Sequence, residues 1–337
     1  VAERLGVSYV VSGAYAVLGG RARLHIELCD ARDDTVCWAT SATLSIEDFF
    51  RGQDPVLPEV IAALGREIVA AELRRVGSLP MPSLASYTLY LGGVGLLHRL
   101  SRRDFERSRE LLQFLAERQP RAAAPHAMLS KWHMLRIVQG WAESADDEAR
   151  QARAAARRAL DLDDQEAFAL TAEGMVSVLI DKDLDSGAGW YARALEANPH
   201  EPYAWALQSG LQSYRDDHEA ACRSAATALS LSPLDPARFL FEAYAAMAHL
   251  GGGDADTAAT LAQRSLEHNA LHTPSLRILV IAQMLRGQAD EARRAAARLM
   301  SLEPGLRVGD YVRRFPGRES PNLRRYAEAL AAAGVPQ

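Results

Sequence analysis

Six helix endings of similar sequence recur along this chain. They read Leu115-Ala-Glu-Arg-Gln-Pro120, Ala159-Leu-Asp-Leu-Asp-Asp164, Ala194-Leu-Glu-Ala-Asn-Pro199, Ala228-Leu-Ser-Leu-Ser-Pro233, Ser265-Leu-Glu-His-Asn-Ala270 and Leu299-Met-Ser-Leu-Glu-Pro304. Their last positions are separated by 44, 35, 34, 37 and 34 residues. Insertions at residues 140–147 and 251–253 account for the two longer intervals. A fixed period near 34 residues predicts a tandem array of helical hairpins.

A small residue stands twelve positions before each ending, where the two helices of a hairpin must approach closely. These residues are Ser108, Ala152, Gly187, Ala221, Ala258 and Ala292. The combined pattern resembles the tetratricopeptide repeat (TPR) family over residues 83–304. The resemblance implies a mainly α protein, with about six hairpins in a right-handed superhelix and two capping helices in residues 305–337. A generic bundle of alanine-rich hairpins is the alternative.

Residues 1–79 follow a different pattern. Strict alternation from Arg21 to Leu28 predicts a half-buried strand, and Gly19-Gly20 predicts a hairpin to a strand over residues 9–17. A third strand is expected over 35–43, a helix cap at Ser45, and an amphipathic helix over 56–76. Pro80-Met-Pro82 then predicts a linker.

The runs 5–13 and 23–30, followed by Trp38, look like the second half of a small α/β module similar to the amino-terminal domain of the TolB translocation protein. Beside bacterial TPR arrays, this module lies between the repeats and an amino-terminal output domain. That domain is commonly a class III adenylate/guanylate cyclase or a winged-helix DNA-binding domain. The first residues, Val1-Ala-Glu-Arg-Leu-Gly6, read as the end of a helix and predict a piece of a longer protein.

Composition argues against several classes of function. The net charge of -5 gives no basic excess for nucleic-acid binding, and no run approaches the ~20 apolar residues of a membrane span. Three cysteines without a C-x-x-C pair favour a reducing compartment, and we expect a cytoplasmic location. His126 and His133 are too far apart for a metal pair, and residues 181–192 lack the glycine and glutamate of a calcium loop. We therefore expect no catalytic residues, no cofactor and no metal.

The concave face of such an array is lined by the first helix of each repeat. Aromatic, arginine and methionine side chains are enriched at protein interfaces. The repeat register places candidates for a groove or interface at Trp132, Arg136, Met175, Tyr203, Tyr214, Tyr244, Arg277 and Met284. The inserted loop that departs from the repeat period adds Trp141, because insertions often lie at a binding edge. Packing between helices is the alternative for each of them.

The sequence thus predicts a non-catalytic interaction and regulatory scaffold, the C-terminal half of a bacterial signalling protein with a cyclase-type output domain. Its partner would be a protein or peptide in the concave groove, or a second copy of the chain. The alternative is the sensing half of a winged-helix transcriptional regulator.

Overall fold

The computed structural model describes residues 6–51, 56–232 and 235–337. The chain divides into two compact units, Val1–Gly92 and Gly93–Gln337. The boundary falls within helix α4 (Ser86–Leu97), whereas the sequence pattern starts the repeats at residue 83. Pro233, the last residue of the fourth predicted helix ending, lies outside the described residues.

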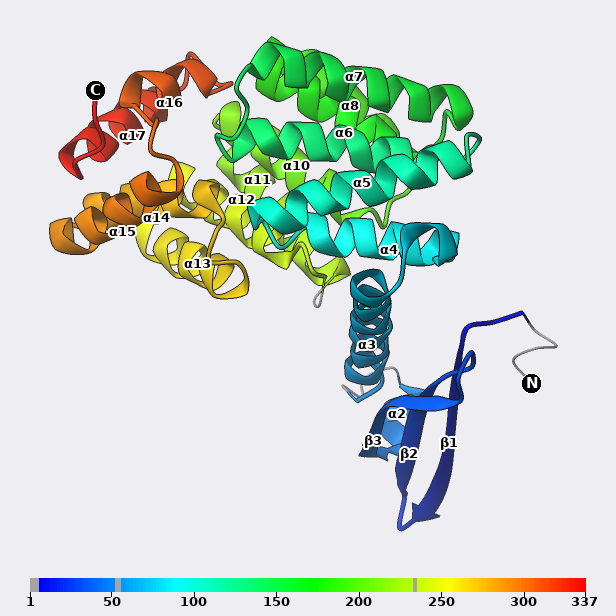
Figure 1. The fold of residues 1–337 in the computed structure, drawn as a ribbon. Coiled ribbons are helices and arrows are strands. Elements are labelled where there is room, and N and C mark those ends of the chain that lie inside the picture. Colours follow the sequence, from blue (N-terminus) through cyan, green and yellow to red (C-terminus); the bar gives the residue numbers. More distant parts are fainter. Residues whose placement is uncertain (1–5, 52–55, 233–234) are drawn as a thin grey trace. The chain divides into compact units, whose positions relative to one another are not determined.

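The first unit begins with a three-stranded antiparallel sheet in the order β1-β2-β3 (Figure 1). Gly19 and Gly20 have φ values of 57° and 77°, the left-handed conformation that a tight hairpin turn needs. Alternation along the second strand buries Ala22 and Leu28 on one face. The predicted strands and hairpin are confirmed. The strands are β1 (Tyr9–Leu18), β2 (Arg21–Asp30) and β3 (Thr35–Ser45).

Short helix α2 begins directly after β3, and its cap was predicted. The Ser45 side chain accepts a hydrogen bond from the Asp48 backbone N–H at 3.2 Å. This bond satisfies one of the free N–H groups at the start of a helix. The helical elements of this unit are α2 (Ile46–Phe50), α3 (Val56–Ser78), the 3-10 turn η1 (Met81–Ser83) and the start of α4 (Ser86–Leu97).

A network of charged and phenolic groups, here called the sheet–helix clamp, ties α3 to the sheet. Arg32 Nη2 donates to Asp30 Oδ2 and to Glu72 Oε1, both at 2.7 Å. The Tyr9 hydroxyl donates to the same Glu72 oxygen at 2.5 Å, and Arg75 Nη2 donates to Asp30 Oδ2 at 2.7 Å. Asp30 and Glu72 are buried, so these partners replace the water that the two carboxylates lose.

The second unit is a stack of helical pairs, each packed on the next (Figure 1). Within the described residues, six successive hairpins agree with the sequence period. The fold is therefore a TPR-type helical-repeat solenoid, as the sequence predicted. The pairs are α4 with α5 (Arg102–Arg118), α6 (Ala123–Val138) with α7 (Ala145–Leu162), α8 (Ala167–Val176) with α9 (Leu184–Ala197), α10 (Pro202–Tyr214) with α11 (His218–Leu231), α12 (Arg238–Gly251) with α13 (Ala255–His268), and α14 (Thr273–Leu285) with α15 (Ala289–Leu302).

Small residues let the paired helices approach closely. All six predicted small positions, Ser108 through Ala292, are fully or almost fully enclosed. In the first hairpin, Ser108 Oγ donates to the Gly93 carbonyl at 2.7 Å, and a Cβ on Gly93 would overlap Leu112. In the third hairpin, the π-helical turn η2 (Ser177–Asp181) extends α8 before α9 begins.

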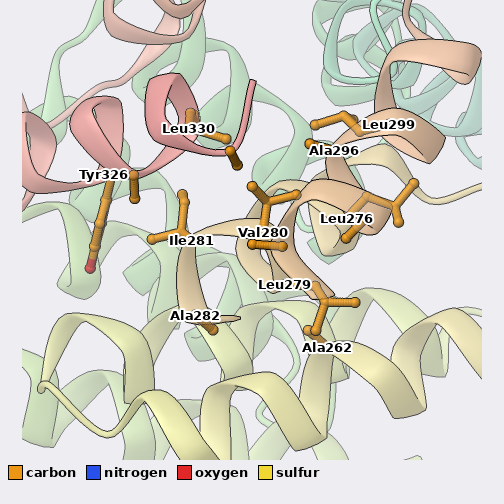
Figure 2. Close-up of a cluster of buried hydrophobic side chains, with 14 of the residues drawn as sticks. Ala262, Leu276, Leu279, Val280, Ile281, Ala282, Ala296, Leu299, Tyr326 and Leu330 are labelled. Atoms are coloured by element: carbon orange, nitrogen blue, oxygen red, sulfur yellow. The ribbon is translucent and has the colours of Figure 1, made fainter. Parts of the chain in front are cut away.

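Two further helices follow the last repeat and share its core. These are α16 (Val308–Arg314) and α17 (Pro321–Ala332). Figure 2 shows Leu276, Val280 and Ile281 of α14 between α13, α15 and α17. Leu330 of α17 is fully buried in this cluster. The C-terminal helices therefore complete the core of the last repeat, as a cap must.

The second unit also makes contacts between distant repeats, here called the seam. The seam comprises the hydrogen bonds that join residues 98–216 to residues 269–322. Gln139 Nε2 donates to the Leu271 carbonyl at 3.3 Å, and its Oε1 accepts from the Thr273 hydroxyl at 2.7 Å. Asn269 Nδ2 donates to the His98 carbonyl at 2.7 Å. The ends of early helices thus meet the last repeat.

The seam continues toward the C-terminal helices. Lys182 Nζ donates to the Arg314 carbonyl at 2.5 Å, and the Ser320 hydroxyl donates to Asp216 Oδ1 at 2.7 Å. These bonds join residues more than 100 positions apart. The solenoid therefore closes on itself within the second unit.

Candidate functional site

Three of the nine candidate residues lie in the interior of the second unit. Trp132 is 0%, Met175 2% and Tyr203 4% exposed. Trp132 stacks on Phe105 at 4.8 Å between ring centroids, and its Nε1 donates to the Phe105 carbonyl at 2.8 Å. The Tyr203 hydroxyl donates to the Met175 sulfur at 3.4 Å. These three side chains pack helices together, the alternative that the sequence left open.

Tyr214, Tyr244 and Met284 are half-buried. Tyr214 makes an edge contact with Phe315 at 5.1 Å, and burial raises the pKa of its hydroxyl to about 12. Burial also raises the pKa of Tyr244 well above its usual value. Met284 packs against the core of the last repeat. The two phenols keep their protons at physiological pH, and methionine has no titrating group. All three side chains are therefore uncharged and offer contact area alone.

Arg277 lies at the seam. Its guanidinium donates to the Val138 carbonyl at 3.2 Å and pairs with the buried Glu303 carboxylate. The second Glu303 oxygen accepts from Arg314 Nη1 at 2.7 Å. Gly140, with a φ of 73°, passes so close to Glu303 that a Cβ there would overlap its carboxylate. A residue expected to reach a partner in the groove thus binds a carbonyl of its own chain.

Arg136 and Trp141 form a partly exposed patch at the turn between α6 and α7. Arg102 lies over the Trp141 ring, 5.2 Å from its centroid, and Phe105 meets the edge of the ring at 5.1 Å. Arg136 donates to Glu148 at 2.6 Å and lies over Trp132. We call Arg102, Arg136 and Trp141 the tryptophan patch. Indole and guanidinium groups held in this way can bury large area at little cost in entropy.

A buried amine that no sequence motif indicated lies deeper in the same unit. Lys131 is 3% exposed, and its Nζ is 3.0 Å from His98 Nε2 and 4.0 Å from the centroid of the Tyr203 ring. Burial lowers the pKa of Lys131 to about 8. Burial also holds the pKa of His98 well below its usual value, so the histidine is neutral and accepts from the ammonium.

One feature of the sequence sets Lys131 and the seam residue Lys182 apart, namely the rarity of lysine. Of the 38 basic residues, these two alone are lysine, and all the others are arginine. Gln139 carried no such signal, because its partners lie more than 130 positions away.

Residues of the two motifs that the sequence argued against as a metal pair and a calcium loop have other partners in the structure. His133 Nδ1 is 2.6 Å from Glu148 Oε2, and Asp183 caps α9. Within residues 6–51, 56–232 and 235–337, no group of three or more metal-ligating side chains comes together. In the same ranges, no helix combines the length and the apolar character needed to cross a bilayer.

No family model matches the chain. The chain is 27% identical over 166 residues to a putative adenylate cyclase 3 of Rhizobium meliloti (strain 1021). This match covers 49% of the chain but only 28% of that relative.

Solved structures resemble parts of this chain at low sequence identity. The APC/C hetero-tetramer Cut9–Hcn1 has a TM-score of 0.50 and 11% identity, over 76% of this chain and 45% of that one. TTC0263, a thermophilic TPR protein of Thermus thermophilus, has a TM-score of 0.42 and 18% identity, over 56% of this chain and 93% of that one.

Proposed function

We propose that this chain is a non-catalytic interaction and regulatory module of a bacterial signalling protein with a cyclase-type output domain. The observation that carries the proposal is the joint occurrence of a helical-repeat solenoid and a partial match to a putative adenylate cyclase. Stacked hairpins expose a large, regular surface and need no catalytic group to transmit a binding event. The chain spans less than a third of that relative, so its output chemistry would reside elsewhere.

The tryptophan patch is the surface that we assign to partner binding. Interface hot spots are enriched in tryptophan and arginine, because these side chains bury a large area. Trp132, Met175 and Tyr203 are enclosed, whereas Trp141 and Arg136 remain partly exposed. The α6–α7 turn also interrupts the repeat period, and insertions in repeat proteins often lie at a binding face. The partner is a protein segment that covers an apolar ring flanked by positive charge.

The test uses the native full-length protein and measures cyclic-nucleotide formation. Trp141→Ala should change this activity while the thermal stability stays close to that of the wild type. Trp190→Ala is the matched control, because Trp190 on α9 is also partly exposed and also has an arginine, Arg193, over its ring at 4.6 Å. Equal activity in wild type and both variants would rule out the tryptophan patch as the regulatory surface.

The sequence of the native polypeptide before Val1 tests the output domain separately. Two metal-binding aspartates in a cyclase-like domain would support the proposal. A winged helix with a basic recognition helix would replace it with the alternative, the sensing half of a transcriptional regulator.

A further inference from the structure

Strand β1 forms one edge of the three-stranded sheet in the first unit (Figure 1). Within the described residues, β2 is the only strand that pairs with it. The strand is ten residues long and contains no proline, no charged side chain and no shift of register against β2. Proteins usually protect an edge strand with charges, proline, a bulge or a covering segment, because its free backbone groups attract another strand. Strand β1 carries none of the first three.

The backbone groups that point to the open edge belong to alternate residues of β1. The Ala31 backbone N–H donates to the Ser8 carbonyl at 2.9 Å, in the same register that pairs Tyr9 with Asp30. Because hydrogen-bonded and non-hydrogen-bonded pairs alternate in an antiparallel ladder, the even-numbered residues of β1 bond to β2. The N–H and carbonyl groups of the odd-numbered residues, Tyr9 to Val17, therefore point toward the open edge.

The side chains of the same odd-numbered residues form an apolar strip on one face of the sheet. Tyr9 marks that face, since its hydroxyl reaches Glu72 on α3 in the sheet–helix clamp. Farther along the strand, Val11 is 54%, Tyr15 76% and Val17 55% exposed. Helix α3 packs against β3 and leaves these three side chains uncovered. Strand β1 thus offers backbone donors, backbone acceptors and apolar side chains together.

The opposite edge of the sheet, β3, is built differently. Its pairing with β2 shifts register between Leu28 and Cys29, an irregularity that disfavours the addition of another strand. In the part of the chain that the structure describes, β3 exposes one large apolar side chain, Val36, whereas β1 exposes four. The features that favour strand addition are therefore gathered on β1.

We propose that β1 is a homodimer interface, at which two copies of this chain pair antiparallel through their β1 edges. A two-fold axis at Gly13 places Val11 of each copy opposite Tyr15 of the other. The same register pairs Tyr9 with Val17. All these residues are odd-numbered, so the free N–H and carbonyl groups of one copy meet those of the other. Aromatic and β-branched side chains form favourable cross-strand pairs, and here each such pair occurs twice.

Charge and size both fit a second copy. Because β1 carries no charged side chain, the pairing places no like charges opposite each other. The register forms about ten backbone hydrogen bonds, the number typical of a protein interface. With the exposed side chains, the two copies together bury on the order of 1,000 Å², the lower limit for a specific interface. We therefore expect a dimer that dissociates at micromolar concentrations.

The first experiment measures association by sedimentation velocity over a range of concentrations. Val11→Lys and Tyr15→Glu should each weaken the dimer at least about tenfold, since each puts a charge into an apolar pair. An equimolar mixture of these two variants should recover most of the affinity, because the two substituted positions face each other across the axis. Val36→Lys, at a valine of β3 that is 56% exposed, is the matched control and should associate like the wild type.

Two outcomes of this experiment would overturn the proposal. One is a wild-type chain that stays monomeric at high concentration. The other is a dimer that Val11→Lys and Tyr15→Glu leave intact, since the copies then associate through another surface. A mixture that recovers no affinity would reject the register centred on Gly13.

The second experiment needs no variant to fold, because it follows amide hydrogen exchange of the wild-type chain by NMR. Exchange at the Val11, Gly13 and Tyr15 amides should slow at least about tenfold from low to high concentration. The Ser12 and Ala14 amides, which bond to β2, should be protected at both. Odd-numbered amides that exchange fast at every concentration would contradict a β1 interface.

The native full-length protein is measured in the same way, since a strand that precedes Val1 is the competing occupant of this edge. Protection of the odd-numbered amides in a monomer would assign the edge to that strand and end the homodimer proposal. The interface does not include the tryptophan patch, which lies in the second unit. Trp141→Ala should therefore leave the association unchanged, and failure of one proposal leaves the other standing.

Discussion

At the scale of single residues, two glycines of α9 differ in their surroundings. A Cβ on Gly187 would overlap the Val178 side chain, whereas a Cβ on Gly189 would meet open space. Gly187 is one of the positions where the repeat pattern requires a small residue, and the structure gives the reason. Neither glycine has a positive φ, so alanine is compatible with the backbone at both sites. The two positions therefore differ only in how closely neighbouring side chains pack against them.

Gly187→Ala should lower the free energy of unfolding by about 1–3 kcal/mol, because the added methyl group overlaps Val178 and forces α9 away from η2. Gly189→Ala, the matched control on the same helix, should leave it unchanged or raise it by up to about 1 kcal/mol, since alanine favours the helix. Urea unfolding monitored by circular dichroism measures both values. Equal stability in the two variants would contradict the close packing at Gly187.

At the scale of elements, the sheet–helix clamp makes the first unit dependent on two buried carboxylates. Burial raises the pKa of Glu72, but hydrogen bonds from Thr88, Tyr9 and Arg32 outweigh this effect and lower it below the usual 4.5. The same balance lowers the pKa of Asp30, through bonds from Arg32 and Arg75. A carboxylate whose pKa is lower in the folded chain stabilises the fold above its unfolded pKa. That contribution is lost progressively as the pH falls below about 4.5.

Glu72→Gln should therefore lower the melting temperature of the first unit at pH 7, where the carboxylate binds Arg32 and Tyr9. The difference from wild type should shrink as the pH falls below about 4.5, because the native carboxylate then loses its advantage over the unfolded chain. Differential scanning calorimetry at several pH values measures this trend. Glu59→Gln, on the exposed face of the same helix, is the control. A difference that does not vary with pH would argue against the charged form of Glu72.

At the scale of the whole second unit, the seam decides whether the solenoid presents an open groove or a closed interior. Its bonds are polar and join segments that lie far apart in sequence. Gln139 contributes a donor and an acceptor to residues 271–273, and Arg277 adds a bond to the Val138 carbonyl. Removing one side chain of such a pair leaves the polar group of the other buried without a hydrogen-bond partner. The free-energy cost of that unsatisfied group exceeds the net stability that a hydrogen bond contributes.

Gln139→Leu should lower the free energy of unfolding by about 1–3 kcal/mol and speed hydrogen exchange over residues 269–277, since Thr273 loses its partner. The radius of gyration from small-angle X-ray scattering should rise if the seam opens fully. Gln263→Leu, at an exposed position on α13, serves as control. Unchanged exchange at residues 269–277 in Gln139→Leu would contradict the seam.

Much of the local structure could be predicted because it depends on residues close in sequence. The 34-residue period identified the hairpins, alternation identified β2, and Ser45 and Gly19-Gly20 marked a cap and a turn. Each of these signals acts within a few residues, through backbone hydrogen bonding or the spacing of apolar side chains. The burial of the candidate groove residues could not be predicted in this way. Register gives the face of a helix, but not whether another segment covers that face.

The sequence by itself determined that this chain is a TPR-type solenoid preceded by a small sheet, since repeats and alternation are properties of neighbouring residues. Only the tertiary structure decided that the solenoid closes on itself, that Trp132 and Tyr203 are enclosed, and that Lys182 bridges to Arg314. These features join positions that leave no common local pattern. They arise from the small rotation between successive repeats, which accumulates along the array until its distant parts meet.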